Sequence, residues 1–361
     1  MKNHYVFILM LGTLFFSCAK QENSLTTLPI KGFRDTIHVQ GRHTGIKDPE
    51  IGGLKIFDSI AFFSLYSHSQ YGYRAYNLNT FKQMGNIIQK GRGPKEFTSP
   101  QLLSQPPERT NGEIKVWIKD FPTKISLVNI TQTLYTGKTI VEKEYNFVRP
   151  GKANMLYQSN IPYIIEDGIF LMNLSQERSR NSDNPNPEPV YIIYAYTEDR
   201  SIDTLRFNYN FGIYSYMDKT NSRIVSTSPV EDIISIYDFK AKHETILYHT
   251  IKKPEEVYKV TAPKFEIPDY AYYGCEIHNN LIICAYYKNI KMASRNPGGN
   301  YYIHIFDLDG RPLYCLVLNE HLSTFSFDER NFILYGLDKE GNMYAYSLQK
   351  ILKKKRNAER E

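Results

Sequence analysis

Apolar and polar residues alternate in short runs along most of the chain, and these runs are rich in Tyr, Ile, Val and Phe. Asn, Asp, Gly and Pro separate one run from the next, and no long stretch keeps the period of a helix. Alternation with a period of two is typical of β-strands that bury one face. The pattern therefore predicts an all-β protein.

A tight turn that opens a strand recurs at regular intervals. Most of these turns contain Asn, Asp or Gly, which tolerate the left-handed backbone that a two-residue hairpin requires. The turns are Asp58-Ser59, Asn111-Gly112, Asp167-Gly168, Asn221-Ser222, Asn279-Asn280 and Glu329-Arg330. Successive strand openings are 53, 56, 55, 57 and 51 residues apart, at Ile60, Glu113, Ile169, Ile224, Leu281 and Phe332. A period near this length, with about four strands per repeat, is typical of a propeller blade.

Six repeats predict a six-bladed β-propeller with four-stranded antiparallel blades over residues 30–350. The last repeat, from Leu322 to about Lys350, holds only three strands. A ring needs its final sheet completed, because an unpaired edge invites aggregation. The segment from Ile30 to Gln40 alternates apolar and polar residues before the first full repeat. We therefore predict that an N-terminal strand completes the last blade.

The first strand of each repeat is expected to line the central channel, where ligands of propellers usually bind. We assign these strands to Gly52–Phe57, Ser99–Gln105, Asn160–Ile165, Asn210–Tyr216, Tyr270–Ile277 and Leu322–Phe327. They are rich in Tyr, which offers a flat apolar face and a hydroxyl group. This predicts a ligand-binding surface that includes Tyr214, Tyr272 and Tyr273. The alternative is that these rings only pack between sheets.

The same strands offer little catalytic chemistry. Glu276 is their only carboxylate, whereas a calcium site requires several oxygen ligands. The histidines are scattered, and no Gly-x-Ser-x-Gly elbow of a hydrolase occurs. We therefore expect binding rather than catalysis, with no metal and no other cofactor.

Cys275 and Cys284 occupy facing positions of one predicted hairpin. If Asn279-Asn280 is a two-residue turn, the two cysteines form a non-hydrogen-bonded pair with Cα atoms about 4.5 Å apart. That separation is just inside the range for a disulfide. The pair therefore forms either a disulfide or two buried free thiols, which are ordinary core material.

The first residues have the features of a targeting segment. Residues 1–17 combine Lys2 with an apolar run of about a dozen residues, too short to span a bilayer as a helix. The run Leu14-Phe15-Phe16-Ser17-Cys18 resembles a lipoprotein signal of the kind used by Bacteroidetes, and the resemblance implies a lipid on Cys18. The alternative is a plain secretory signal. Residues 18–29 are polar at first and are predicted to form a tether.

The most specific run of residues is Gly91-Arg92-Gly93-Pro94-Lys95-Glu96-Phe97, between the first and second repeats. It resembles the Gly-x-Gly-Pro-x-Glu-Phe signature of TolB-like six-bladed propeller lipoproteins of Bacteroidetes, in which Gly is frequent at the position of Lys95. The resemblance implies an envelope-anchored propeller and transfers no catalytic residues. We expect Glu96 to accept backbone hydrogen bonds and Phe97 to wedge between blades. The alternative is that Arg92 and Lys95 present charge at a channel mouth.

The net charge of +6 comes mostly from the two ends of the chain. Lys2 supplies one unit, and Lys350 to Glu361 contains six basic and two acidic residues. The body is therefore near +1 and gives no support for nucleic-acid binding. We expect residues 351–361 to form a solvated basic tail or a weak contact with anionic lipid.

Two insertions interrupt the repeats, at residues 175–189 and 288–300. Both are rich in Asn and Pro or Gly, a composition that suits a functional loop or a mobile surface loop.

The sequence as a whole predicts a lipid-anchored, monomeric binding scaffold in the cell envelope, with the outer membrane as the expected site. Its ligand is expected to be a protein, peptide or glycan. The alternative function is a hydrolase or lyase acting on a carbohydrate or lactone. A third possibility is a structural partner within an envelope complex, which a large exposed apolar patch would support.

Overall fold

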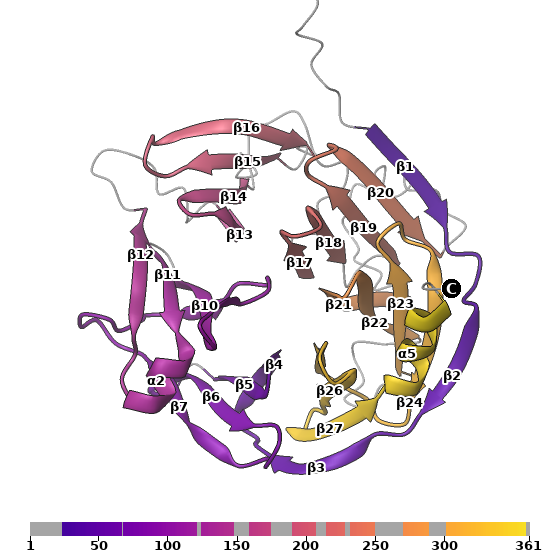
Figure 1. The fold of residues 1–361 in the computed structure, drawn as a ribbon, viewed down its shortest axis with the longest axis horizontal. Coiled ribbons are helices and arrows are strands. Elements are labelled where there is room, and N and C mark those ends of the chain that lie inside the picture. The colour runs from indigo at the N-terminus through magenta and orange to yellow at the C-terminus, as the bar shows by residue number, and fades with distance from the viewer. Residues whose placement is uncertain are drawn as a thin grey trace, which may run out of the picture.

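The computed structural model describes residues 24–66, 68–120, 124–147, 159–174, 190–206, 214–227, 232–249, 270–288 and 301–358. These residues form a ring of six small β-sheets (Figure 1). Each sheet is one blade, and its successive strands run outward from the centre as an antiparallel meander. The predicted six-bladed β-propeller is therefore confirmed. Cys18 and the insertions at 175–189 and 289–300 lie outside the described residues.

The first three blades follow the repeats of the sequence. Blade 1 contains, from the centre outward, β4 (Ile51–Phe57), β5 (Ile60–Leu65), β6 (Tyr71–Asn77) and β7 (Gln83–Gln89). Blade 2 contains β8 (Pro100–Leu102), β10 (Glu113–Asp120), β11 (Lys124–Asn129) and β12 (Val141–Asn146), and β9 (Glu108–Thr110) pairs with β10. Blade 3 contains β13 (Ser159–Glu166), β14 (Ile169–Leu174), β15 (Val190–Ala195) and β16 (Arg200–Arg206).

The other three blades each gain an outermost strand from the N-terminal region. Blade 4 contains β17 (Tyr214–Asp218), β18 (Arg223–Thr227), β19 (Ile233–Asp238), β20 (His243–Tyr248) and β1 (Ser24–Pro29). Blade 5 contains β21 (Tyr270–His278), β22 (Leu281–Lys288), β23 (Tyr301–Asp307), β24 (Pro312–Leu318) and β2 (Asp35–Val39). Blade 6 contains β25 (Thr324–Asp328), β26 (Ile333–Leu337), β27 (Asn342–Ser347) and β3 (Arg42–Lys47).

The N-terminal region closes the ring, but through a different segment from the one expected. Strand β3 pairs antiparallel with β27 and completes blade 6, so an N-terminal strand does complete the last blade. The expected segment, 30–40, instead contains β2, which pairs in parallel with β24 of blade 5. Strand β1, within the predicted tether, pairs in parallel with β20 of blade 4. The three strands thus run along the outside of the ring and cover three blade edges (Figure 1).

Apolar side chains hold neighbouring blades together. Each of the six interfaces between adjacent blades contains its own cluster of buried residues. The cluster between blades 5 and 6 also takes Leu352 from the helix α5 (Gln349–Ala358). The predicted basic tail therefore begins as a helix anchored on the ring. A second helix, α2 (Ile130–Thr136), follows β11 directly and is capped by the side chain of Asn129.

The predicted turns have the expected backbone in five of the six repeats. Asp58, Asn111, Gly168, Ser222 and Asn279 all have positive φ angles. In the sixth repeat the positive φ belongs to Phe332 rather than to Glu329-Arg330.

The run from Gly91 to Phe97 connects β7 to β8 and joins blades 1 and 2. A carboxylate oxygen of Glu96 accepts a hydrogen bond from the Gly93 amide at 2.7 Å. A Cβ atom at position 91 would lie only 2.0 Å from the same carboxylate, so a side chain there would displace Glu96. Phe97 is fully buried in the cluster between the two blades. Both structural roles expected for Glu96 and Phe97 are confirmed.

Lys95 has a φ angle of +65°, in the left-handed region that glycine adopts without strain. We expect Lys95→Gly to raise the free energy of unfolding by about 0.5–1 kcal/mol, because a side chain in this region is strained. Urea denaturation measures the change. The matched control is Lys82→Gly, since Lys82 is also exposed but its φ is not positive. A loss of stability in Lys95→Gly equal to that of the control contradicts the prediction.

Candidate functional site: the central channel

A cavity of about 450 Å³ occupies the centre of the ring. Residues of all six blades line it, mostly from the innermost strands or the segments beside them. Representative lining residues, in the order of blades 1 to 6, are Lys55, Gln101, Pro162, Tyr214, Tyr273 and Phe325. Each of the six predicted innermost strands thus supplies one of these residues. We call the face on which the innermost strands begin the upper face.

Two tyrosines lie near the upper end of this cavity. Tyr214 is the first residue of β17 and is 37 % exposed. Its ring centroid lies 6.0 Å from that of Tyr273, which packs edge-on against Tyr287 at 4.8 Å. The structure therefore brings the predicted ligand residues Tyr214 and Tyr273 together in the cavity wall.

Tyr272 corrects the sequence interpretation, because it faces away from the channel. It is fully buried between blades 4 and 5, and its hydroxyl group lies 2.9 Å from His304 Nδ1 and 3.0 Å from His249 Nε2. Tyr273 belongs to the lining of the cavity and Tyr272 does not. Tyr272 is a core residue.

Cys275 and Cys284 face each other across β21 and β22, as the turn predicted. Both thiols are nevertheless free and buried, so the disulfide considered from the sequence is not formed. The Cys275 thiol donates to the carbonyl oxygen of Val225 at 3.3 Å, on the neighbouring blade. Burial raises the pKa of Cys275 to about 12, which keeps the thiol protonated.

Arg92 and Lys95 are exposed and do not belong to the cavity lining. Their loop precedes β8 and therefore lies on the upper face, but its contacts are those of a blade junction. The structure gives these two residues no place in the channel site.

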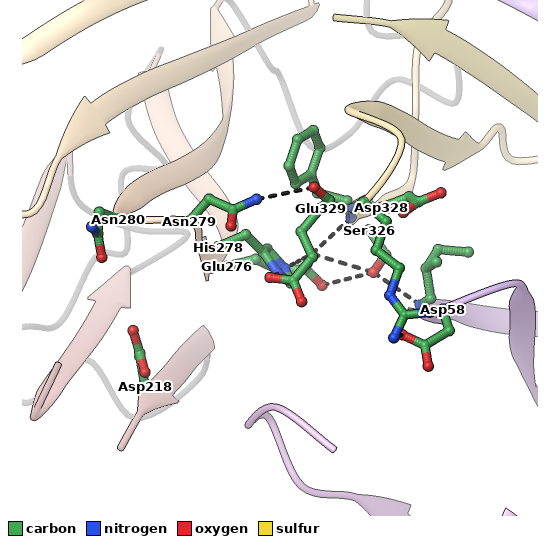
Figure 2. A network of polar contacts seen from close by, with 12 residues as sticks. Asp58, Asp218, Glu276, His278, Asn279, Asn280, Ser326, Asp328 and Glu329 are labelled. Atoms are coloured by element: carbon green, nitrogen blue, oxygen red, sulfur yellow. Dashed lines mark hydrogen bonds and ion pairs between the residues drawn. The ribbon is translucent and has the colours of Figure 1, made fainter. Parts of the chain in front are cut away.

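Glu276 lies in the lower part of the cavity and is almost completely buried. Lys55 Nζ of blade 1 lies 2.7 Å from its Oε1, and His278 Nε2 lies 3.0 Å from its Oε2. From blade 6, the Ser326 hydroxyl donates to Oε1 at 3.0 Å and the Phe327 amide donates to Oε2 at 2.9 Å. Figure 2 shows Glu276, His278 and Ser326 of this group pointing toward one another.

Further ion pairs surround this carboxylate on the lower face. His278 Nδ1 lies 3.6 Å from Glu329, and Arg109 of blade 2 lies 3.6 Å from the same residue. Asp58 of blade 1 accepts from Arg109 and from Arg330 of blade 6, each at 3.0 Å. We call the whole set the floor network; it consists of Lys55, Asp58, Arg109, Glu276, His278, Ser326, Glu329 and Arg330. It links blades 1, 2, 5 and 6 across the lower end of the channel.

Ion pairs within the floor network stabilise the charged forms of Glu276 and His278 and so shift the pKa of each residue. Burial alone would raise the pKa of Glu276, but the charge of Lys55 and the bond from His278 lower it to about 2. Burial alone would lower the pKa of His278, but Glu276 and Glu329 raise it to about 9. At neutral pH, Glu276 is therefore an anion and His278 a cation.

Lys119 of blade 2 belongs to the lining of the cavity, as do Phe62, Ser64 and Tyr73 of blade 1 and Leu102 of blade 2. Lys119 is 4 % exposed, and burial lowers its pKa to about 8. The cavity therefore contains a lysine that is charged at neutral pH at an energetic cost.

The described lining of the cavity contains one carboxylate, that of Glu276, and the protein donors described above occupy both of its oxygens. A general acid or base needs an oxygen that can reach the substrate. Among the residues that the structure describes, no three His, Cys, Asp or Glu side chains are grouped so as to hold a metal ion.

The sequence interpretation missed the charged residues of this site. Lys55 and Glu276 both lie on predicted innermost strands, so a lysine and a lone carboxylate facing one channel were the available signal. Lys119 lies on β10, the second strand of its blade counted from the centre, and no sequence pattern places it in the cavity. Arg109 lies on the short strand β9, which the repeat does not predict.

Comparisons with known proteins assign neither a family nor a function to this chain. No protein-family model matches this chain, and no curated protein matches it either. A solved structure of an exported protein of Bacteroides fragilis is similar, with 12 % identity and a TM-score of 0.49, over 86 % of this chain and 99 % of that one. A chain of the mitotic checkpoint complex has 8 % identity and a TM-score of 0.40, over 84 % of this chain and 89 % of its own. Across the part of the chain that the structure describes, no helix is long and apolar enough to cross a membrane.

Proposed function

We propose that this protein is a cell-envelope binding protein that takes a small ligand, or one end of a larger one, into the central channel. The observation that carries the proposal is the volume of the cavity. Its volume of about 450 Å³ lies in the range typical of small-molecule sites, roughly 300–1,000 Å³. Such a cavity accommodates a mono- or disaccharide or a short peptide end.

The chemistry of the wall supports this function. Tyr214 and Tyr273 provide flat rings with hydroxyl groups, which suit stacking on a sugar or a peptide. Ser64, Ser104 and Thr324 add hydroxyl groups around the same space. The floor network ties together the blades below this space, so the proposed route of entry is the upper face.

The N-terminal region supports the proposed location. The apolar run of residues 1–17 and the residues before Cys18 fit a lipoprotein signal, and a lipid on Cys18 would tether the ring to an envelope membrane. We retain the outer membrane as the proposed site.

Substitution of the two tyrosines tests the proposed function. The mature protein is titrated with a panel of mono- and disaccharides and di- and tripeptides, and binding is followed by saturation-transfer NMR. We expect at least one member to bind, and Tyr214→Ala and Tyr273→Ala each to weaken its binding about fivefold, since stacking contributes about 1 kcal/mol. The control is Tyr135→Ala, because Tyr135 is 88 % exposed on α2. An absence of binding across the panel, or binding that both channel variants leave unchanged, contradicts the proposal.

A further inference from the structure

Strand β1 and the helices α2 and α5 all begin at the lower face of the ring. The innermost strands run from the upper to the lower face, so the third strand of each meander ends at the lower face and the fourth begins there. Strand β1 is parallel to β20, the fourth strand of blade 4, and the amide of its first residue, Ser24, donates to the carbonyl oxygen of Lys242 at 3.1 Å. The helices α2 and α5 follow β11 and β27, the third strands of blades 2 and 6.

The start of β1 limits where a lipid on Cys18 can be attached. Five residues separate Cys18 from Ser24. An extended chain spans at most about 3.6 Å per residue, so the Cα atoms of Cys18 and Ser24 lie no more than about 22 Å apart. Strand β1 is itself 6 residues long, which is about 20 Å, so the tether is used up before it passes the upper face. A membrane that takes up this lipid therefore lies close to the lower edge of blade 4.

The helix α5 brings positive charge to the same face. Its sequence contains four lysines, one arginine and no acidic residue. Leu352 is buried against the ring, whereas Lys350 and Lys353 are exposed and make no ion pair with any residue that the structure describes. A cluster of basic residues on a helix is typical of a surface that binds anionic lipid headgroups.

The helix α2 adds an exposed aromatic ring. Tyr135 is 88 % exposed, and Lys138, which follows the helix, is exposed as well. Tyr is enriched where a membrane meets water, because its ring is apolar and its hydroxyl group is polar. Figure 1 shows α2, α5 and β1 at separate places around the ring. Three separate contacts on one face would hold the ring flat on a membrane rather than on its edge.

We propose that the lower face of the ring rests on an anionic phospholipid surface, with the basic helix α5 and Tyr135 of α2 contacting the headgroups beside the lipid-anchored N-terminus. The inference rests on the proposed anchoring through Cys18 and goes beyond it, because it assigns the face of the ring and the charge of the lipid. The upper face, which is the proposed route of entry to the channel, then points away from the membrane.

Vesicle flotation tests the contact without the lipid anchor. The mature protein with Cys18→Ser is mixed with vesicles of phosphatidylcholine, either alone or with an equal part of phosphatidylglycerol. We expect binding only to the vesicles with phosphatidylglycerol. Lys350→Glu combined with Lys353→Glu should weaken it about thirtyfold, since each lysine near an anionic surface contributes about 1 kcal/mol. The matched control is Lys47→Glu combined with Arg92→Glu, because these exposed residues lie at the upper face and the charge changes equally.

Fluorescence quenching on the lipidated protein tests which face meets the membrane. A bimane label is attached to Tyr135→Cys at the lower face or to Arg92→Cys at the upper face, and the vesicles contain lipids with a nitroxide on the headgroup. The other described cysteines are buried and do not compete for the label; they are Cys275, Cys284 and Cys315. We expect quenching at position 135 to be at least twofold stronger than at position 92.

The outcomes separate the inference from the proposed function. Absence of flotation with phosphatidylglycerol, or an equal loss in the lower-face and upper-face variants, overturns the membrane contact and leaves channel binding standing. Binding to soluble polyglutamate but not to the vesicles also overturns it, because α5 then recognises an acidic polypeptide. Equal quenching at the two labelled positions overturns the orientation. A mature protein whose mass shows no lipid on Cys18 overturns the proposed anchoring, and the inference falls with it, whereas channel binding again stands.

Discussion

Replacement of Glu276 by Gln is expected to lower the free energy of unfolding by about 3–5 kcal/mol. The substitution keeps the shape of the side chain but removes its charge, and it places an amide donor among the donors of Lys55 and His278. Glu276 is 2 % exposed, so water does not replace the lost interactions. Removal of one partner from a buried ion pair leaves the other charge uncompensated, which is why the loss is large.

Urea denaturation with an unchanged m-value measures this effect. The matched control is Glu340→Gln, which removes a carboxylate that pairs with Lys339 at 3.6 Å but is 52 % exposed. The control should cost less than about 1 kcal/mol, because exposed ion pairs contribute little. A loss in Glu276→Gln no larger than that of the control would falsify the assignment of Glu276 to a stabilising buried network.

A double variant separates the cost of an unpaired charge from the value of the pair. Lys55→Met combined with Glu276→Gln removes both charges of this pair and keeps a side-chain oxygen that can accept from Ser326 and Phe327. We expect the double variant to be more stable than Glu276→Gln alone, because the ammonium group of Lys55 is then no longer left without its counter-charge. A double variant less stable than that single variant would show that the pair itself contributes more than its desolvation costs.

The floor network should also lose stability in a defined alkaline window. The pKa of His278 rises from 6.5 to about 9 on folding, so the folded state binds its proton more tightly than the unfolded state. The resulting stabilisation is complete below pH 6.5 and is lost as the pH rises through about 9. Its full size is about 3 kcal/mol.

The pH dependence is measured as a difference between two proteins. The free energy of unfolding is determined for the natural protein and for His278→Gln across this window, so that other titrating groups cancel. We expect the advantage of the natural protein to shrink by about 3 kcal/mol from the acidic to the alkaline end. Glu329→Gln removes one of the two carboxylates on His278 and should reduce the effect part of the way. An advantage that stays constant across the window would exclude a charged His278.

The sequence predicts the fold well because each propeller repeat is specified by local features, namely its turn residues and the alternation of apolar and polar positions. The turns at Asp58, Asn111 and Asn279 have the left-handed backbone that their residue types indicate. The Gly91–Phe97 run was assigned as a blade junction, and its Glu96 and Phe97 have the contacts expected of one. Such features depend on neighbours within a few residues, so they can be recognised without the tertiary structure.

The site was predicted only in part. Tyr214 and Tyr273 line the cavity because they lie on innermost strands, as the repeat indicates. Tyr272 does not, and the direction of each side chain depends on a register shift between Tyr272 and Cys275, beside Gly274 with its φ of +86°. A repeat pattern shows that a strand is present, but a local irregularity decides which of its residues face the channel.

The sequence by itself determined the number of blades, their antiparallel order and the strands that line the channel, because hydrophobic period and turn chemistry are local properties. The tertiary structure alone decided which blades receive the N-terminal strands, since an alternating segment specifies a strand but not its partner. It alone also assembled the floor network, in which Lys55 and Glu276 meet although they are 221 residues apart. Ring closure brings those two strands together, and no local pattern encodes a contact made by closing the ring.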